Sequence, residues 1–153
     1  MRLVSTRDAG AAALPYSDVL LAGLAPDGGL YVPTEYPKLT TKEILALRGA
    51  SYADIAFAVK KKLIGGSIPD EALRAMVDVA YQEPQFALER GHVTPLTQIG
   101  EQLYVENLSL GPTASFKDMA MQMLGREMDY ELKRRGEHLV ILGATSGDTG
   151  SAA

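Results

Sequence analysis

The expected fold depends most on residues 139–151, which read Leu-Val-Ile-Leu-Gly-Ala-Thr-Ser-Gly-Asp-Thr-Gly-Ser. Four consecutive apolar residues predict a strand in a sheet that is covered on both faces. The Gly-rich loop that follows predicts a turn into a helix, where backbone N–H groups and hydroxyls can bind a carboxylate or a phosphate. A nucleoside triphosphate is disfavoured because no Lys follows the glycines. A tight strand-to-helix turn without a ligand is the alternative.

A second motif lies upstream, where residues 111–118 read Gly-Pro-Thr-Ala-Ser-Phe-Lys-Asp. Ser115 and Asp118 have the spacing of a helix cap, which places Lys117 in the first helical turn. The positive end of the helix dipole disfavours an ammonium group there, and burial beside Phe116 would act in the same direction. A neutral amine is the form that condenses with a carbonyl cofactor. The alternative is a solvated lysine that follows a loop.

The order of predicted elements around these motifs is typical of an α/β domain. Residues 103–106 alternate like a strand, after a turn at residues 99–101, and a helix is predicted to follow Lys117 as far as about Arg135. The strand and the Gly-rich loop of residues 139–151 come next. The helix is expected to bury five apolar residues, which are Met119, Ala120, Met123, Leu124 and Met128.

Residues 1–92 are expected to form a separate, mainly helical domain, and residues 93–153 the beginning of the α/β domain. A short strand is predicted at residues 30–32, followed by helices in residues 40–82. Capping patterns mark the first two helices, at Thr40 with Glu43 and at Ser51 with Asp54. Gly65 and Gly66 stop the second helix, and Ile68 with Pro69 opens the third, with its apolar face at Leu73, Met76, Val77 and Ala80.

Composition limits the classes of function. The chain has 153 residues, 46% of them hydrophobic and 22% charged, which suits a soluble domain with its own core. The net charge of -4 argues against a nucleic-acid partner. Without Cys, and with two separated His, no disulfide, thiolate chemistry or metal site is expected. The apolar run at residues 19–24 is too short to span a membrane, and acidic residues spoil a secretory signal, so a cytoplasmic location without membrane partners is expected.

Taken together, the motifs resemble the N-terminal part of the threonine synthase family, pyridoxal phosphate enzymes with the tryptophan synthase β-like fold (fold type II). The resemblance covers the whole chain. Its ordered motifs lie at residues 5–7, 23–33, 94–96, 111–113, 116–118, 120–122 and 146–150. The chain departs from the family pattern at Ser109 and Leu110, where the family commonly has Phe-His.

The resemblance implies a fold and a set of site residues. The fold would be an N-terminal mainly helical domain followed by the start of a three-layer α/β/α domain. Lys117 would form the Schiff base with pyridoxal 5'-phosphate, and Phe116 and Asp148 would also contact the cofactor, Asp148 near its ring hydroxyl. The α-carboxylate of the substrate would be bound by Thr145, Ser146, Gly147, Thr149 and Gly150. Arg7 would contribute to the site for the substrate phosphate.

The implied activity is that of a lyase of threonine biosynthesis, which converts O-phospho-L-homoserine and water into L-threonine and phosphate. Family members are considerably longer, so this chain is expected to be truncated, inactive by itself and a weak cofactor binder. Apolar surface on the strand at residues 138–143 would then favour self-association. Two alternatives remain open: a serine or threonine dehydratase, which should lack the motif at residues 23–33, and a non-catalytic, self-associating fragment.

Overall fold

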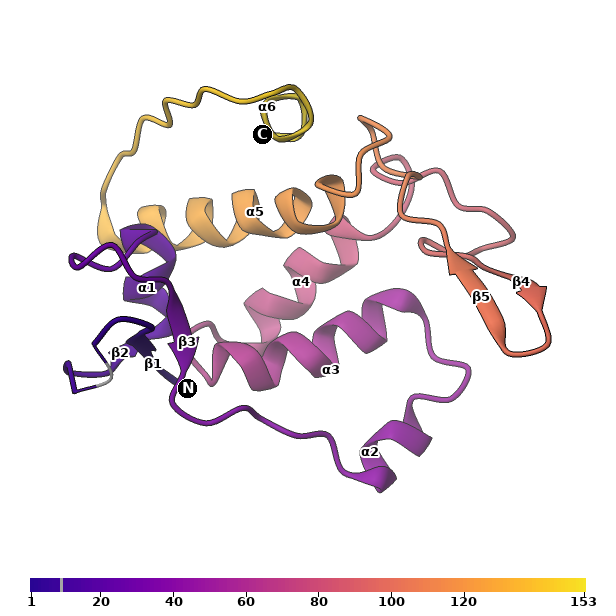
Figure 1. Ribbon diagram of the computed structural model, residues 1–153, viewed down its shortest axis with the longest axis horizontal. Helices are drawn as coiled ribbons and strands as arrows, with labels where there is room; N and C mark the ends of the chain where they lie inside the picture. Colours follow the sequence, from indigo (N-terminus) through magenta and orange to yellow (C-terminus); the bar gives the residue numbers. More distant parts are fainter. Residues whose placement is uncertain (9) are drawn as a thin grey trace. The chain divides into compact units, whose positions relative to one another are not determined.

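The computed structural model describes residues 1–8 and 10–153, and over these residues the fold is mixed α/β, with helices α1–α6 and two small antiparallel sheets (Figure 1). The chain divides into two compact units, residues 1–75 and 76–153. The boundary between the units falls inside helix α4 (Asp70–Ala80), whereas the sequence predicted a boundary between residues 92 and 93. The division into domains of residues 1–92 and 93–153 stays a prediction.

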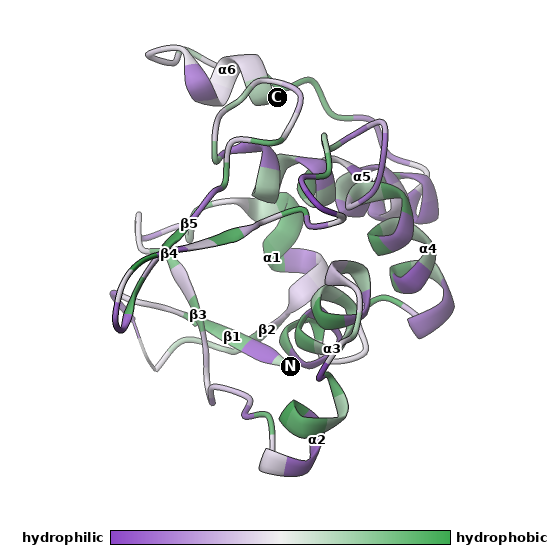
Figure 2. Cartoon of the chain, turned by 90° about the vertical axis from the view of Figure 1, so that its right-hand side faces the viewer, coloured by the Kyte–Doolittle hydropathy of each residue, from purple (hydrophilic) through white to green (hydrophobic). Residues whose placement is uncertain are grey.

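The first unit contains a three-stranded sheet in the order β2-β1-β3. Strands β2 (Leu14–Pro15) and β3 (Tyr31–Pro33) both pair antiparallel with β1 (Arg2–Ser5). The predicted strand near residues 30–32 is confirmed as β3, one residue further along. Leu3, within β1, is buried, while the first residue of that strand is exposed. Figure 2 shows a hydrophilic colour at the end of β1 near the N-terminus.

Capping side chains and a glycine set several helix ends in the first unit. Helix α1 (Tyr16–Ala22) follows Pro15. Helices α2 (Thr41–Ala46) and α3 (Tyr52–Ile64) each start with a complete capping box, formed by Thr40 with Glu43 and by Ser51 with Asp54. Helix α3 ends at Gly65, which adopts the left-handed conformation with φ of 59°. Both predicted capping patterns and the predicted helix stop are confirmed.

Helix α4 (Asp70–Ala80) has the apolar face that its sequence predicted. Leu73, Val77 and Ala80 are buried at intervals of three and four residues, which is the spacing of one helical face, and Met76, the fourth residue predicted for that face, is half-buried. The hydroxyl of Tyr81, directly after the helix, donates to the Met119 carbonyl oxygen at 2.8 Å. That bond fixes the first turn of α5 (Asp118–Arg135), the helix that follows Lys117.

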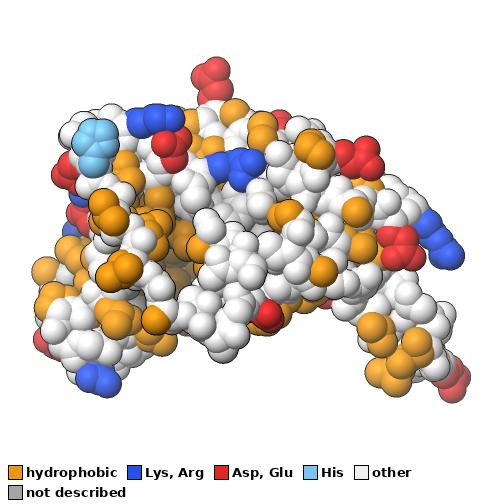
Figure 3. Space-filling model, turned by 90° about the horizontal axis from the view of Figure 1, so that it is seen from above, with side chains coloured by type: hydrophobic (Ala, Val, Ile, Leu, Met, Phe, Trp, Pro, Cys, Tyr) orange, Lys and Arg blue, Asp and Glu red, His pale blue; other side chains and the backbone are white. Residues whose placement is uncertain are grey.

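The second unit contains a β-hairpin of β4 (Leu96–Gly100) and β5 (Leu103–Glu106). The predicted strand at residues 103–106 is confirmed, whereas the turn predicted at residues 99–101 lies at residues 101–102, because residues 99 and 100 still belong to β4. Every residue of both strands is exposed, including the apolar ones. The lobe at the right of Figure 3, where the hairpin lies in Figure 1, accordingly carries hydrophobic side chains.

Helix α5 (Asp118–Arg135) ends as predicted, with Gly136 in the left-handed conformation. Its buried face differs from the prediction: Met123 is buried as expected, but the other buried residues are Asp118, Glu127 and Glu131. The other four apolar residues expected on that face are partly or fully exposed. A helix can bury a carboxylate when cations one turn away neutralise it, a possibility that an apolar pattern does not reveal.

Glu131 illustrates that point, because its side chain is 0% exposed. Arg134 donates to both carboxylate oxygens, at 2.9 and 2.6 Å, and Arg135 donates to Oε1 at 2.6 Å. These bonds, those of Arg134 first, hold the pKa of the Glu131 carboxyl below its usual range although burial opposes them.

The strand predicted at residues 139–142 is not formed, and this prediction is wrong for the chain as described. Val140 and Leu142 are 92% and 98% exposed. A strand needs a partner for its backbone N–H and C=O groups, and within residues 1–8 and 10–153 the segment pairs with none. The helix predicted after the Gly-rich loop does form, as α6 (Asp148–Ala152). Among the helices described, none is long and apolar enough to cross a membrane.

Candidate functional site around Lys117

Lys117 lies immediately before the regular part of α5. Its backbone is already helical, with φ of -58° and ψ of -29°, and the helix begins at Asp118. Ser115 is buried, and its hydroxyl accepts a hydrogen bond from the Lys117 N–H at 3.2 Å. Lys117 therefore occupies the N-cap position, one residue before the helix, whereas the sequence predicted it inside the first turn after a cap at Ser115. The predicted cap is only half correct, because Asp118 turns away from Ser115 toward the preceding loop.

The turn before the lysine is held by the Asp118 carboxylate, which is completely buried. Its Oδ2 accepts from the Thr113 N–H at 2.9 Å, and its Oδ1 accepts from the Thr113 hydroxyl at 2.8 Å. Gly111 has no room for a side chain, since a Cβ there would collide with the Asp118 side chain. Further upstream, the Ala87 N–H donates to the Leu110 carbonyl oxygen at 2.8 Å and fixes the start of the turn.

The amine of Lys117 lies beside an aromatic ring. Its Nζ is 4.8 Å from the centre of the Phe116 ring, within the range of a cation–π interaction. The lysine is half-buried, but Phe116 is 57% exposed, so the burial expected beside Phe116 is not present. Within the described part of the chain, the amine has no hydrogen bond or ion pair. It is thus accessible to an aldehyde.

The Gly-rich loop is folded around one of its own hydroxyls. Thr145 Oγ1 accepts from the N–H of Gly147 at 3.2 Å and from the N–H of Gly150 at 3.1 Å. Gly147 has φ of 142°, which favours glycine, and Asp148 starts α6 directly after it. Ser146 and Asp148 are exposed, and Thr149 is half-buried. The loop is therefore a turn into a helix, and two N–H groups predicted to bind an anion are held by Thr145.

Lys117, Phe116 and the loop at residues 145–150 all belong to the second unit, whereas Arg7 belongs to the first. Over the residues described, no hydrogen bond or ion pair joins the lysine to the loop. The structure thus positions the lysine motif and the loop motif separately, each by contacts within its own segment.

Arg7 is part of a cluster that sequence reasoning did not assemble. Asp27 accepts from the Ser5 hydroxyl with both carboxylate oxygens, at 2.8 Å each, and from the Gly29 N–H at 2.8 Å. Arg7 Nη1 donates to the Asp27 carbonyl oxygen at 3.0 Å. The Gly29 bond first, then the Ser5 bond, lowers the pKa of the Asp27 carboxyl. The sequence signal that could have indicated this cluster is the run Ala-Pro-Asp-Gly-Gly at residues 25–29, which is typical of a turn and contains the acidic residue.

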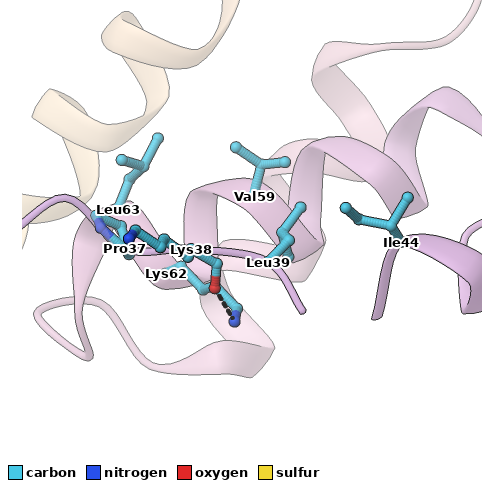
Figure 4. A pocket seen from close by; sticks show the side chains of 7 residues that line it. All are labelled: Pro37, Lys38, Leu39, Ile44, Val59, Lys62 and Leu63. Atoms are coloured by element: carbon cyan, nitrogen blue, oxygen red, sulfur yellow. Dashed lines mark hydrogen bonds between the residues drawn. The ribbon is translucent and has the colours of Figure 1, made fainter. Parts of the chain in front are cut away.

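Two hollows in the described part of the first unit are lined by residues near the elements above. One, of about 270 Å³, lies beside the Ser5–Asp27 cluster and is lined mainly by small and apolar residues. The other, of about 410 Å³, is an apolar groove lined by Pro37, Lys38, Leu39, Ile44, Val59, Lys62 and Leu63 (Figure 4). Lys62 donates from Nζ to the Lys38 carbonyl oxygen at 2.8 Å and is also bonded to Glu43, so its charge is neutralised. Over the described residues, no group of three acidic or His side chains could hold a metal ion.

Comparison with known proteins identifies the family. The family model for the threonine synthase N terminus matches residues 2–81. The chain belongs to the threonine synthase family. Over its whole length it is 47% identical to the threonine synthase of Methylobacillus glycogenes and 48% identical to that of Corynebacterium glutamicum. It spans about a third of the length of these curated relatives, 33% and 32%.

A solved member of the threonine synthase family has the same fold over this region. The pyridoxal phosphate-bound threonine synthase of Brucella melitensis superposes with a TM-score of 0.92 and 51% identity. The superposition covers 99% of this chain and 32% of that one. The family resemblance inferred from the ordered motifs is therefore confirmed.

Proposed function

We propose that this chain is the N-terminal part of a pyridoxal phosphate-dependent lyase that converts O-phospho-L-homoserine and water into L-threonine and phosphate. The observation that carries the proposal is the likeness over the whole chain to a threonine synthase that binds this cofactor, with an accessible amine at the start of α5. In the complete protein, residues 93–153 would begin a three-layer α/β/α domain. The apolar segment at residues 139–142 would be one of its internal strands.

Lys117 is the residue we assign to the cofactor. An amine without a hydrogen-bond or ion-pair partner in the described chain, beside the Phe116 ring and after the small residues Ala114 and Ser115, fits a planar aldehyde. Bound pyridoxal phosphate supplies an electron sink for charge that develops next to the substrate's amino group. When substrate is bound, Lys117 would take up and return protons at Cα and the neighbouring carbons.

The Gly-rich loop is the proposed site for the substrate's α-carboxylate. Ser146 and Thr149 have hydroxyl donors, and Gly147 and Gly150 have N–H groups that Thr145 now occupies. Rotation of the Thr145 side chain would release these two N–H groups for an anion. Asp148 would lie near the cofactor's ring hydroxyl, to which a carboxylate can be a hydrogen-bond acceptor.

Arg7 remains our candidate for part of the site for the substrate phosphate. Its side chain is exposed, and the one hydrogen bond that the described residues provide to it, from Nη1 to Asp27, leaves other guanidinium donors for an anion. A role limited to holding the turn at residues 27–29 is the competing interpretation. Phosphohomoserine affinity of an Arg7→Ala variant separates the two, since unchanged affinity removes Arg7 from the phosphate site.

The proposal is tested in a polypeptide of the relatives' length that contains these 153 residues. Phosphate and threonine formation from O-phosphohomoserine is measured for the Lys117→Arg variant and for Lys133→Arg, an exposed lysine on the same helix. We expect Lys117→Arg to lower the rate by about a thousandfold or more, and Lys133→Arg to leave it unchanged. Full activity of Lys117→Arg would contradict the proposal.

The same assay separates the dehydratase alternative, because a dehydratase would release ammonia and a keto acid instead of phosphate. Assayed alone, the 153-residue chain is expected to show no sustained phosphate release. Within residues 1–8 and 10–153, its segment at residues 139–142 has no partner strand, and the N–H groups of Gly147 and Gly150 are held by Thr145. Exposed Val140, Ile141 and Leu142 favour the second candidate function, self-association of this chain.

A further inference from the structure

We propose that Asp118 is a positioning residue for Lys117: its buried carboxylate braces the turn at residues 111–113 and thereby fixes the point from which the lysine side chain projects. This inference rests on the proposed function of Lys117. Asp118 itself does not contact the lysine amine in any hydrogen bond or ion pair of the described residues. Its effect would pass through the backbone on either side of residue 117.

The first step of the argument is the burial of the carboxylate. A completely buried carboxylate destabilises a fold unless donors compensate it. Here the donors are the N–H and the hydroxyl of Thr113, at 2.9 and 2.8 Å. Both oxygens therefore bond to one residue of the turn, which closes a rigid ring between residue 113 and the first residue of α5.

The second step concerns the residues inside that ring. Ala114 has φ of 56°, in the left-handed region that residues with a Cβ seldom adopt, so the surrounding contacts must hold it there. Ser115 follows, and its buried hydroxyl bonds to the Lys117 N–H. The Asp118 brace and the Ser115 bond together enclose residues 114–117.

The third step is the contact between the brace and its surroundings. The Asp118 side chain fills the space beside Gly111, where a Cβ would collide with it. The bond from Tyr81 to the Met119 carbonyl oxygen holds the next residue of α5. The lysine backbone is therefore fixed from both sides, while its amine keeps the freedom of a long side chain. Catalytic geometry depends on such supporting contacts, since small displacements of a reacting group cause large rate losses.

The test uses a polypeptide of the relatives' length that contains these 153 residues, freed of cofactor, with pyridoxal 5'-phosphate as the probe. The chain is incubated with the aldehyde, reduced with borohydride and mapped by mass spectrometry, and the label on Lys117 is divided by the mean label on the other lysines. For Asp118→Asn we expect this ratio to fall by about tenfold. The asparagine NH₂ would face one of the two Thr113 donors, so one charge-assisted hydrogen bond to Thr113 is lost. Thr113→Val should also lower the ratio, but by less, because the backbone N–H bond to Asp118 remains.

Asp129→Asn is the matched control, because it removes the same charge from an exposed position on the same helix. Its ratio should equal that of the unmodified chain. A purely electrostatic role of Asp118 predicts the opposite sign, since loss of a neighbouring negative charge favours the neutral, reactive amine and would raise the label on Lys117. Amide hydrogen exchange at Thr113 provides a readout without the probe, and should become faster in Asp118→Asn alone.

The outcomes separate the two proposals. A high ratio in the unmodified chain with an unchanged or increased ratio in a folded Asp118→Asn variant overturns the positioning role and leaves the function of Lys117 intact. An even distribution of label in the unmodified chain overturns both. Should Asp118→Asn fail to fold, as judged by circular dichroism, Thr113→Val decides: an unchanged ratio overturns the brace, and a reduced ratio supports it.

Discussion

The side chain of Asp118 occupies the space in which residue 111 would place a Cβ, so Gly111 and Asp118 fit together only because residue 111 has no side chain. The Asp118 carboxylate therefore contacts residue 111 at the start of the turn and also bonds to Thr113 within it. This contact connects the Gly-Pro-Thr segment to the helix that begins after Lys117. A glycine at this place is explained by close approach of a neighbour, since its φ is not in the left-handed region.

Gly111→Ala should therefore destabilise the chain by overpacking. We expect a loss of about 1–3 kcal/mol in the free energy of unfolding, measured by urea denaturation. Gly125→Ala is the control, because Gly125 is inside α5 with nothing within 4 Å of its added Cβ. That variant should gain about 0.5–1 kcal/mol, as alanine is the better helix former. Equal effects at the two positions would contradict the contact.

Glu43 and Lys62 predict a dependence of stability on pH. The Lys62 hydrogen bond, followed by those of the Thr40 N–H and hydroxyl, lowers the pKa of Glu43 to about 2. A carboxyl whose pKa is lower in the folded than in the unfolded chain contributes stability above its ordinary pKa and loses it as the pH falls toward 2. Glu43→Gln should thus lower the thermal midpoint at pH 7 and have little effect near pH 2.

Glu101→Gln is the control for Glu43→Gln, because Glu101 is exposed in the hairpin turn. This control should leave the thermal midpoint unchanged at both pH values. A Glu43→Gln difference that stays constant from pH 7 to pH 2 would show that the ion pair does not stabilise the fold. Added salt should reduce the difference at pH 7, because both side chains are partly exposed.

Gly65 and Gly66 offer a second matched pair. Both have positive φ, of 59° and 80°, so alanine at either should cost about 1–2 kcal/mol from the left-handed backbone alone. A Cβ at Gly65 would also collide with Met1, whose ammonium group donates to the Gly65 carbonyl oxygen at 3.0 Å, whereas Gly66 is open. Gly65→Ala should be the more destabilising substitution in urea denaturation. A larger loss of stability for Gly66→Ala than for Gly65→Ala would contradict the contact between Met1 and Gly65.

The exposed segment at residues 139–142 predicts self-association. Val140 and Leu142 are almost fully exposed, and water contact with such side chains is unfavourable. Introducing Asp at both positions should shift the chain toward the monomer in sedimentation velocity experiments. Leu45→Asp, at an exposed position on α2, should not change the distribution. Oligomers that persist in the double variant would exclude this segment as the interface.

Local signals explain most of what the sequence predicted correctly. The capping boxes at Thr40 and Ser51 and the stop at Gly65 depend on side chains within one turn of each helix end, so they can be inferred from neighbouring residues. Lys117 was likewise placed at a helix start from the residues around it. The family followed from many motifs in a fixed order, which is more specific than any single loop.

The errors concern features that depend on distant or paired partners. Residues 139–142 have the composition of an internal strand, but a strand forms only where another strand supplies hydrogen bonds. The buried face of α5 includes Glu131, which was not among the five apolar residues predicted for that face, and its burial is possible because Arg134 and Arg135 neutralise it. The bond of Asp118 to Thr113 replaced the expected cap with Ser115, a choice between two nearby donors that spacing alone does not decide.

The central claim is that Lys117 is the lysine that reacts with pyridoxal phosphate, and the distribution of borohydride-fixed label among the lysines tests it most directly. At a limiting concentration of the aldehyde, we expect most of the label on the peptide that contains Lys117. Surface lysines such as Lys133 should carry only background label. Label spread evenly over the lysines, or concentrated on any lysine other than Lys117, would contradict the account.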